Sequence, residues 1–264
     1  MQITLVQGLL ITLVVFICAF DKHMEAFMWF RPLVVAFLTG IVLGDVQLGL
    51  QAGAVAELSY LGLLTVGGTV PPDPLFAGLM TTVLAYTTGQ DVNAALGLAV
   101  TFALVGQWIG IATNTLYAGF LPSLDRAAAA GDEKAMGRIV IGANILYAAL
   151  FAVAAFLSVY AFQSGIAAFV NMFPEWLVHG FEVAGGLMPA VGLALLLVVM
   201  LKKENVAYLL AGFVIMIITN CANILPVAVI AGCIAWIGFN RDVEMSKLTA
   251  AAAANPEGEF EDGI

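Results

Sequence analysis

The sequence has few charged residues: only 10% of its 264 residues are Asp, Glu, Lys or Arg. An ordinary soluble domain contains about 25%. In this chain 62% of the residues are hydrophobic, and the mean hydropathy is +1.03. The composition excludes a soluble globular domain and indicates an integral membrane protein.

Motifs for phosphate, metal or nucleic-acid chemistry are also missing. The chain has no basic cluster, glycine-rich phosphate loop, His-x-Glu pair or serine nucleophile elbow. Its three cysteines lie in apolar segments without CxxC spacing, and we expect them to be small packed residues. Neither of its two histidines, His23 and His179, has the loop context of a phosphoryl carrier. We therefore expect no catalytic residue, no metal site, no cofactor and no enzymatic activity of its own.

Uncharged windows divide the chain into long and short apolar segments. A helix needs about 20 apolar residues to cross the hydrocarbon core. The windows that reach about this length are 2–20, 92–124, 139–174, 183–201 and 205–240, and the shorter ones are 33–44, 46–56, 58–72 and 75–90. This pattern predicts an all-α, polytopic membrane protein in which full spans are mixed with re-entrant or broken helical hairpins. The first window has no preceding Lys or Arg and no cleavage motif, so we expect it to be retained as a helix.

Charged residues gather outside these windows. Three of the nine Lys and Arg residues fall in the polar segment 125–138, which predicts a cytoplasmic surface helix able to dock a soluble partner. The alternative for these charges is a solvated loop. In the first half of the chain, Lys22 and Arg31 are balanced by Asp21 and Glu25, so no orientation is favoured. Five acids lie between residues 244 and 262. We expect residues 1–240 to form the membrane domain and 241–264 a disordered cytoplasmic tail.

Glu57 stands apart from the other charges because it lies mid-chain between two glycine-containing apolar stretches. The segment 49–73 holds too many Gly and Pro residues for one straight helix, which predicts interrupted backbone at membrane depth. Lipid cannot satisfy free backbone amides, so such backbone packs in protein or lines a polar cavity. It marks substrate sites in transporters. The alternative is that Glu57 ends a short helix at the water interface, where its charge is solvated.

Small residues four positions apart favour close helix packing in lipid. We expect this packing role for the glycine pairs 40/44, 49/53 and 106/110.

Several motifs occur together in a characteristic order. They are Phe30-Arg31-Pro32-Leu33, Gly40-x3-Gly44-Asp45, Gly53-x3-Glu57, Gly67-Gly68-x-Val70-x-Pro72-Asp73 and, further on, Pro174-Glu175 and His179-Gly180-x-Glu182. Over residues 1–240 the chain resembles the membrane IIC component of mannose-type sugar phosphotransferase systems. The segments 78–82, 176–186 and 262–264 are most similar to the branch that handles N-acetylgalactosamine or galactosamine.

The resemblance implies a multi-pass transport subunit of the bacterial cytoplasmic (inner) membrane. It implies pairing with a IID membrane subunit, with the IIC–IID pairs forming a higher oligomer in the lipid bilayer. The sugar would pass inward and be phosphorylated by the IIA and IIB phosphocarrier components. A stand-alone carrier driven by an ion gradient is the alternative, with the carboxylates of Asp45, Glu57 and Asp73 as ion ligands.

A sugar that leaves water needs fixed polar groups to replace its lost hydrogen bonds. Carboxylates suit this role because they accept strong bonds from hydroxyl groups. We predict that Glu57 and Asp73 bind the sugar together with the turn formed by Gly67, Gly68 and Thr69. Asp73 has an alternative role as the cap of the helix that follows Pro74.

Weaker candidates for sugar contact are neutral or peripheral. Gln7, Asn171 and Asn220 lie on otherwise apolar segments, where hydrogen bonding between helices is the alternative role. Asp45 is a further candidate, and we expect it instead to pair structurally with Arg31.

Overall fold

The computed structural model describes residues 2–62, 71–161, 165, 168, 172–219 and 225–254. It forms two compact units, residues 1–199 and 200–264, which we describe separately. Among the described residues, five helices are long and apolar enough to cross a membrane: α1 (Leu5–Met24), α5 (Val92–Ala118), α7 with a following π-helical turn (Glu133–Ala161), α9 (Glu175–Met200) and α11 (Leu225–Ala254). The predicted all-α, polytopic class is confirmed.

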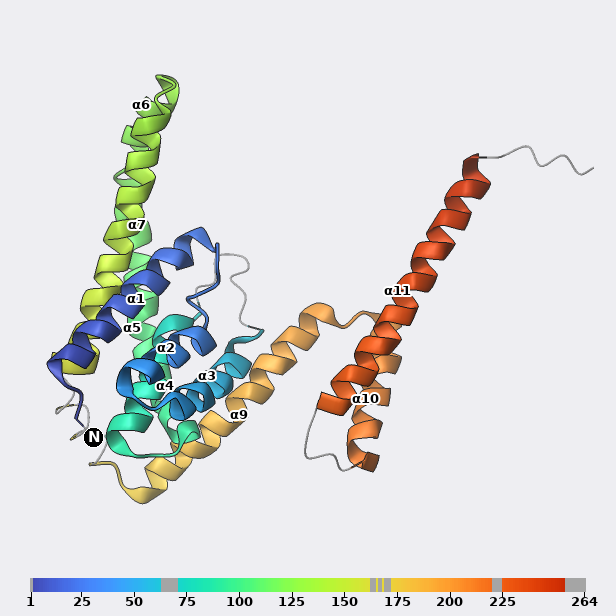
Figure 1. The fold of residues 1–264 in the computed structure, drawn as a ribbon, viewed down its shortest axis with the longest axis horizontal. Coiled ribbons are helices and arrows are strands. Elements are labelled where there is room, and N and C mark those ends of the chain that lie inside the picture. The colour runs from blue at the N-terminus through green and yellow to red at the C-terminus, as the bar shows by residue number, and fades with distance from the viewer. Residues whose placement is uncertain are drawn as a thin grey trace, which may run out of the picture. The chain divides into compact units, whose positions relative to one another are not determined.

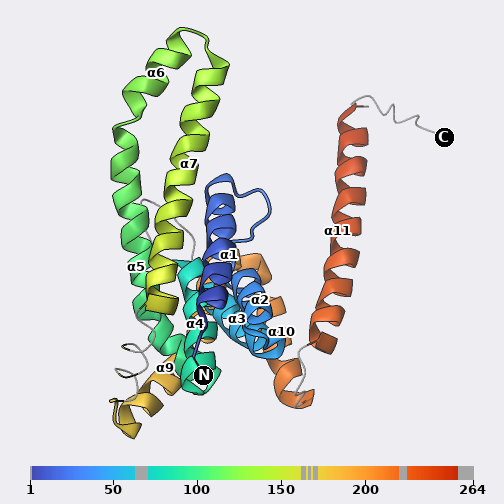
Figure 2. The same cartoon turned by 60° about the vertical axis from the view of Figure 1, so that its left-hand side comes forward.

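Three short helices of the first unit lie between these spans in the sequence. They are α2 (Pro32–Leu43), α3 (Val46–Tyr60) and α4 (Pro74–Thr88), with 12, 15 and 15 residues. Each is too short to cross the hydrocarbon core alone. The three helices pack against one another beside α1, as Figures 1 and 2 show. The predicted mixture of full spans and broken helices is thus confirmed.

Aspartates cap many of these helices. They are Asp45, Asp73, Asp91 and Asp132. A side-chain oxygen of each aspartate accepts a hydrogen bond from a backbone N–H in the first turn of its helix. Such a cap satisfies an otherwise free N–H and places negative charge at the positive end of the helix dipole. Gly44 and Gly89 end α2 and α4 in the left-handed conformation, with φ of 81° and 69°. Aspartates therefore cap the starts of α3, α4, α5 and α7, whereas α2 begins without a side-chain cap.

The core of the first unit surrounds α4. Every residue from Leu75 to Ala85 is buried, as expected for a helix that is apolar on all sides. The centroid of the Phe76 ring on α4 lies 5.5 Å from the centroid of the Phe151 ring on α7. The hairpin formed by α5, α6 (Leu121–Ala129) and α7 extends beyond this core (Figure 2). Residues 121–138 at its tip are mostly exposed.

Glycines allow α2 and α3 to approach closely. A Cβ added to Gly40 or to Gly49 would lie 2.8 Å from the Cα of the other residue. Within the described part of the chain the predicted packing role is wrong for Gly44 and Gly110, because an added Cβ would meet no described atom within 4 Å at either position. It is confirmed for Gly40, Gly49, Gly53 and Gly106.

The second unit consists of a 3₁₀ turn (Lys203–Asn205), α10 (Val206–Thr219) and α11. Helix α11 continues to Ala254, so the disordered tail that we predicted from residue 241 is corrected over residues 241–254. The Ala-rich run before residue 255 favours helix and contains no Gly or Pro. Residues 255–264 lie outside the described residues, and the division into a transport domain and a tail stays a prediction.

Candidate functional site

Glu57 on α3 pairs with Arg31, which directly precedes α2. Arg31 Nε donates to Glu57 Oε1 over 2.7 Å, and Nη2 of the same guanidinium contacts that oxygen. The amide of Leu33 donates to Oε2 over 3.2 Å. The Arg31 and Glu57 side chains are 29% and 20% exposed. Glu57 therefore lies in the last turn of α3, and its carboxylate is half-buried and paired with a cation instead of simply solvated.

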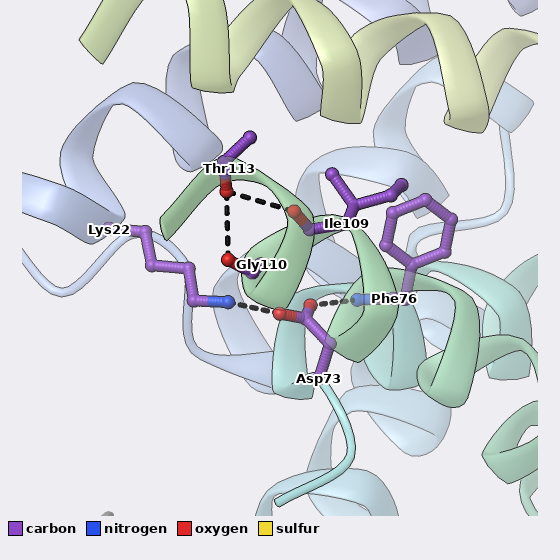
Figure 3. Close-up of polar contacts among 6 residues, drawn as sticks. All are labelled: Lys22, Asp73, Phe76, Ile109, Gly110 and Thr113. Atoms are coloured by element: carbon purple, nitrogen blue, oxygen red, sulfur yellow. Dashed lines mark hydrogen bonds and ion pairs between the residues drawn. The ribbon is translucent and has the colours of Figure 1, made fainter. Parts of the chain in front are cut away.

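Asp73 forms a second and more deeply buried pair. Its side chain is only 2% exposed, and Oδ2 forms an ion pair with Lys22 Nζ (Figure 3). Oδ1 accepts a hydrogen bond from the amide of Phe76 over 3.0 Å. The capping role that we left open for Asp73 is thus confirmed. The same carboxylate also joins the start of α4 to the last turn of α1.

Lys22 reaches this buried carboxylate past aromatic rings. Its Nζ lies 5.0 Å from the centroid of the Phe151 ring and 5.8 Å from that of Tyr147. Both distances fall within the range of a cation–π contact, which partly replaces the hydration of a buried ammonium. The Lys22 side chain therefore links α1, α4 and α7 at one point of the core.

The loop that presents Arg31 is held by Asp21. The two side-chain oxygens of Asp21 accept hydrogen bonds from the amides of Phe27 and Trp29, over 2.9 and 2.7 Å. Glu25 and Met28 in this loop have positive φ values of 46° and 59°. Such backbone is uncommon for residues other than glycine and persists only where its surroundings hold it in place. The position of Arg31 is thus determined by a buried acid ten residues earlier in the chain.

The predicted pairing of Asp45 with Arg31 is wrong. Asp45 is exposed and caps α3, where Oδ1 accepts from the Leu48 amide over 2.9 Å. The cap forms with the aspartate's own helix and needs no distant partner. Arg31 instead meets Glu57, because α2 and α3 pack side by side.

Replacing Asp45 by alanine is expected to lower the free energy of unfolding by about 1 kcal/mol, the usual cost of losing a helix cap. Asp45→Asn keeps the acceptor oxygen and is expected to stay within about 0.5 kcal/mol of the wild type. Unfolding of the purified protein in mixed detergent and SDS micelles measures both variants. Equal destabilisation by the two substitutions would show that Asp45 stabilises the fold through its charge.

The remaining predicted site residues are not brought together by the described structure. Gln7 forms a capping box with Thr4 at the start of α1, and its side-chain oxygen accepts from the Thr4 amide over 3.0 Å. Gly67, Gly68, Thr69, Asn171 and Asn220 lie outside the described residues. In the part of the chain that is described, no three His, Cys, Asp or Glu side chains are grouped as metal ligands would be.

The sequence alone did not reveal which cations pair with Glu57 and Asp73. Lys22 and Arg31 are the only Lys or Arg residues among the first 125. Their isolation in an apolar region was the available clue, because a charge within a membrane protein usually has a partner.

Comparisons with known proteins identify the family. The family model for the sorbose-specific IIC component of phosphotransferase systems matches residues 5–237. The chain belongs to this IIC family. It is therefore a sugar-specific membrane component that works with other phosphotransferase components, and this assignment is favoured over a stand-alone ion-coupled carrier.

Individual relatives refine this relationship. The chain is 41% identical to the N-acetylgalactosamine permease IIC component 1 of Escherichia coli K12, over 100% of this chain and 99% of that protein. It is 29% identical to the mannose-specific EIIC component of the same strain, over 96% and 95% of the two chains. A solved membrane-protein structure, 29% identical, has a TM-score of 0.82 and covers 90% of this chain and 97% of its own. A cryo-electron-microscopy structure of the mannose transporter ManYZ with microcin E492 has a TM-score of 0.58 at 29% identity, covering 91% and 97%.

Proposed function

We propose that this IIC subunit carries an amino sugar of galacto configuration, N-acetylgalactosamine or galactosamine, and that the Arg31–Glu57 pair contacts the sugar. The 41% identical relative is an N-acetylgalactosamine permease component, which supports the substrate class. The observation that carries the site is the half-buried Arg31–Glu57 ion pair, and Glu57 lies a few residues before Gly67, Gly68 and Thr69 in the sequence.

The chemistry of the pair suits a carbohydrate. A hydroxyl group is both a donor and an acceptor, and an arginine–carboxylate pair offers both kinds of partner. Arg31 directs Nε and one Nη2 hydrogen at Glu57, which leaves its other N–H donors for sugar oxygens. Among the described residues, Glu57 Oε2 accepts a hydrogen bond from the Leu33 amide alone, at 3.2 Å, which leaves a lone pair for a sugar hydroxyl.

A buried hydroxyl lies at the end of the helix that carries Glu57. Tyr60, the last residue of α3, is 2% exposed, and its hydroxyl has no hydrogen-bond partner among the described residues. A buried polar atom without a partner is costly, which supports a polar ligand in this region. Gly67, Gly68, Thr69 and Asp73 complete the proposed site, with Asp73 as its more deeply buried acid.

Phosphorylation takes place on other components in this proposal. His179 bonds Glu182 within its own helix, and His23 contacts the rings of Tyr117 and Tyr147, so both histidines have structural contacts. The chain has no phosphorylation site of its own, and one helical block moves against another to present the sugar to IIA and IIB. This transport takes place in the bacterial cytoplasmic membrane.

A IID subunit is the proposed membrane partner, with IIC–IID pairs in a higher oligomer. Only 11% of the apolar window of α9 and none of that of α11 is buried within this chain. These helices therefore present apolar surface to lipid and to the proposed partner.

Glu57→Gln tests the site because it keeps the size of the side chain and removes its charge. Losing a charge-assisted hydrogen bond to the sugar is expected to lower phosphoenolpyruvate-dependent uptake of N-acetylgalactosamine by about tenfold. The measurement uses vesicles that contain the variant with IID, IIA and IIB, normalised to the amount of inserted protein.

Glu244→Gln is the matched control, since Glu244 is exposed on α11 and lies outside both the proposed site and the predicted docking segment 125–138. It is expected to leave uptake unchanged. Normal uptake by Glu57→Gln would reject the site. Gradient-driven uptake by this chain reconstituted alone would reject the phosphotransferase function.

A further inference from the structure

We infer that the second unit binds one phospholipid with an ethanolamine headgroup. Its acyl chain lies in the groove between α10 and α11, and its ammonium group pairs with Asp242. The groove is lined by residues of the second unit alone. The inference does not depend on which sugar the subunit carries.

The groove has the length of an acyl chain. Helix α10 runs beside the first part of α11 (Figure 1), and the space between them has a volume of about 520 Å³, within the range of small-molecule pockets. On α11 the lining runs from Val227 to Asp242, about 22 Å of helix. One leaflet contributes half of a hydrocarbon core that is roughly 30 Å thick. The groove is therefore long enough to hold a chain through its whole leaflet.

The floor of the groove is open above two glycines. An added Cβ on Gly212 or Gly238 would meet no described atom within 4 Å. Both glycines are half-buried and line the groove together with Ile215 and Val227. A helix about 10 Å wide would fill about 1,700 Å³ over the same length, roughly three times the volume of the groove. The dimensions favour a single acyl chain over a partner helix.

Polar side chains line only one end of the groove. They are Asn205 and Tyr208 at the start of α10 and Asp242 on α11. The rest of the lining consists of Ala, Gly, Val, Ile and Phe residues. A polar end followed by an apolar remainder is complementary to the head and the tail of a phospholipid.

Charges of both signs surround the polar end. Lys202 and Lys203 precede α10, Arg241 is adjacent to Asp242, and all three basic residues are exposed. Basic residues at the end of a span indicate the cytoplasmic side of the membrane and attract lipid phosphate. The charge that lines the groove itself is the carboxylate of Asp242, which suits an ammonium group that donates N–H bonds. Only an ethanolamine headgroup supplies both partners, because phosphatidylglycerol has no cation and the methylated ammonium of phosphatidylcholine has no N–H donor.

Native mass spectrometry of the purified full chain tests the lipid site. The protein is freed of lipid in detergent and then mixed with equal amounts of phosphatidylethanolamine, phosphatidylcholine and phosphatidylglycerol that have identical acyl chains. We expect one tightly retained lipid per chain. Phosphatidylethanolamine should be bound about fivefold more than either competitor, the upper end for a solvent-exposed charge pair.

Gly212→Leu tests the position of the acyl chain because it fills the floor of the groove. It is expected to lower retention of all three lipids about tenfold, since the chain loses buried apolar surface. Gly232→Leu on α11 is the matched control. An added Cβ on Gly232 also meets no described atom within 4 Å, and this residue does not line the groove. Its lipid retention should equal that of the wild type.

Asp242→Asn tests the headgroup because it keeps the shape of the side chain and removes its charge. We expect the fivefold preference for phosphatidylethanolamine over phosphatidylcholine to disappear, while a lipid is still retained. Glu244→Gln removes an exposed charge of α11 that does not line the groove, and it should leave the preference unchanged.

Three results would overturn the inference. Equal retention by the wild type and Gly212→Leu would show that lipid only surrounds the outer surface of the protein. Wild-type binding of phosphatidylcholine or phosphatidylglycerol that matches phosphatidylethanolamine would reject the headgroup, and this comparison needs no variant to fold. Release of the retained lipid on addition of IID, together with loss of IID binding in Gly212→Leu, would assign the groove to a partner helix.

Discussion

Lys22→Met is expected to destabilise the protein by about 3–5 kcal/mol, the usual cost of removing one partner of a buried ion pair. The substitution keeps an unbranched apolar side chain against the rings of Phe151 and Tyr147. It leaves Asp73, whose side chain is 2% exposed, as an uncompensated buried charge. The free energy of unfolding in mixed detergent and SDS micelles measures the loss.

The double variant Lys22→Met/Asp73→Asn separates charge from packing. It removes both charges but keeps an oxygen to cap α4, so we expect it to recover most of the lost stability. Arg138→Met, an exposed residue at the start of α7, is the control and should change stability by less than about 0.5 kcal/mol. If Lys22→Met were as stable as the wild type, the Lys22–Asp73 pair would have no structural role.

Gly78→Val is expected to cost about 3 kcal/mol, at the upper end of the usual range for overpacking a core. A Cβ on Gly78 would lie 2.5 Å from the carbonyl oxygen and 2.7 Å from the Cα of Pro32. Both are backbone atoms, so no side-chain rotation relieves the contact. The start of α2 must move instead, and it carries the adjacent Arg31. We therefore expect sugar uptake to fall together with the free energy of unfolding.

Gly142→Val on α7 is the matched control, because an added Cβ there meets none of the described atoms within 4 Å. It is expected to leave both stability and uptake close to the wild-type values. Wild-type stability of Gly78→Val would contradict the close contact between α4 and the start of α2.

Local patterns made part of the candidate site predictable. An aspartate directly before a proline predicted a helix cap at Asp73, because the donor lies three residues away in the same segment. The interrupted sequence around Glu57 likewise indicated short helices, and α2, α3 and α4 have that length. The tail from residue 241 was less predictable, because helix propensity in its Ala run competed with the charges and polar residues around it.

The sequence by itself determined the membrane class, the approximate spans, the helix caps and the family of this protein. These properties follow from composition and from contacts between residues a few positions apart. Only the tertiary structure decided which cation neutralises which acid, since Arg31 and Glu57 are 26 residues apart and Lys22 and Asp73 are 51 apart. Asp21, Glu25 and Asp45 were equally plausible partners for these cations in the sequence. The packing of α2 against α3, and of α1 beside the start of α4, removed that choice by burying the charges together.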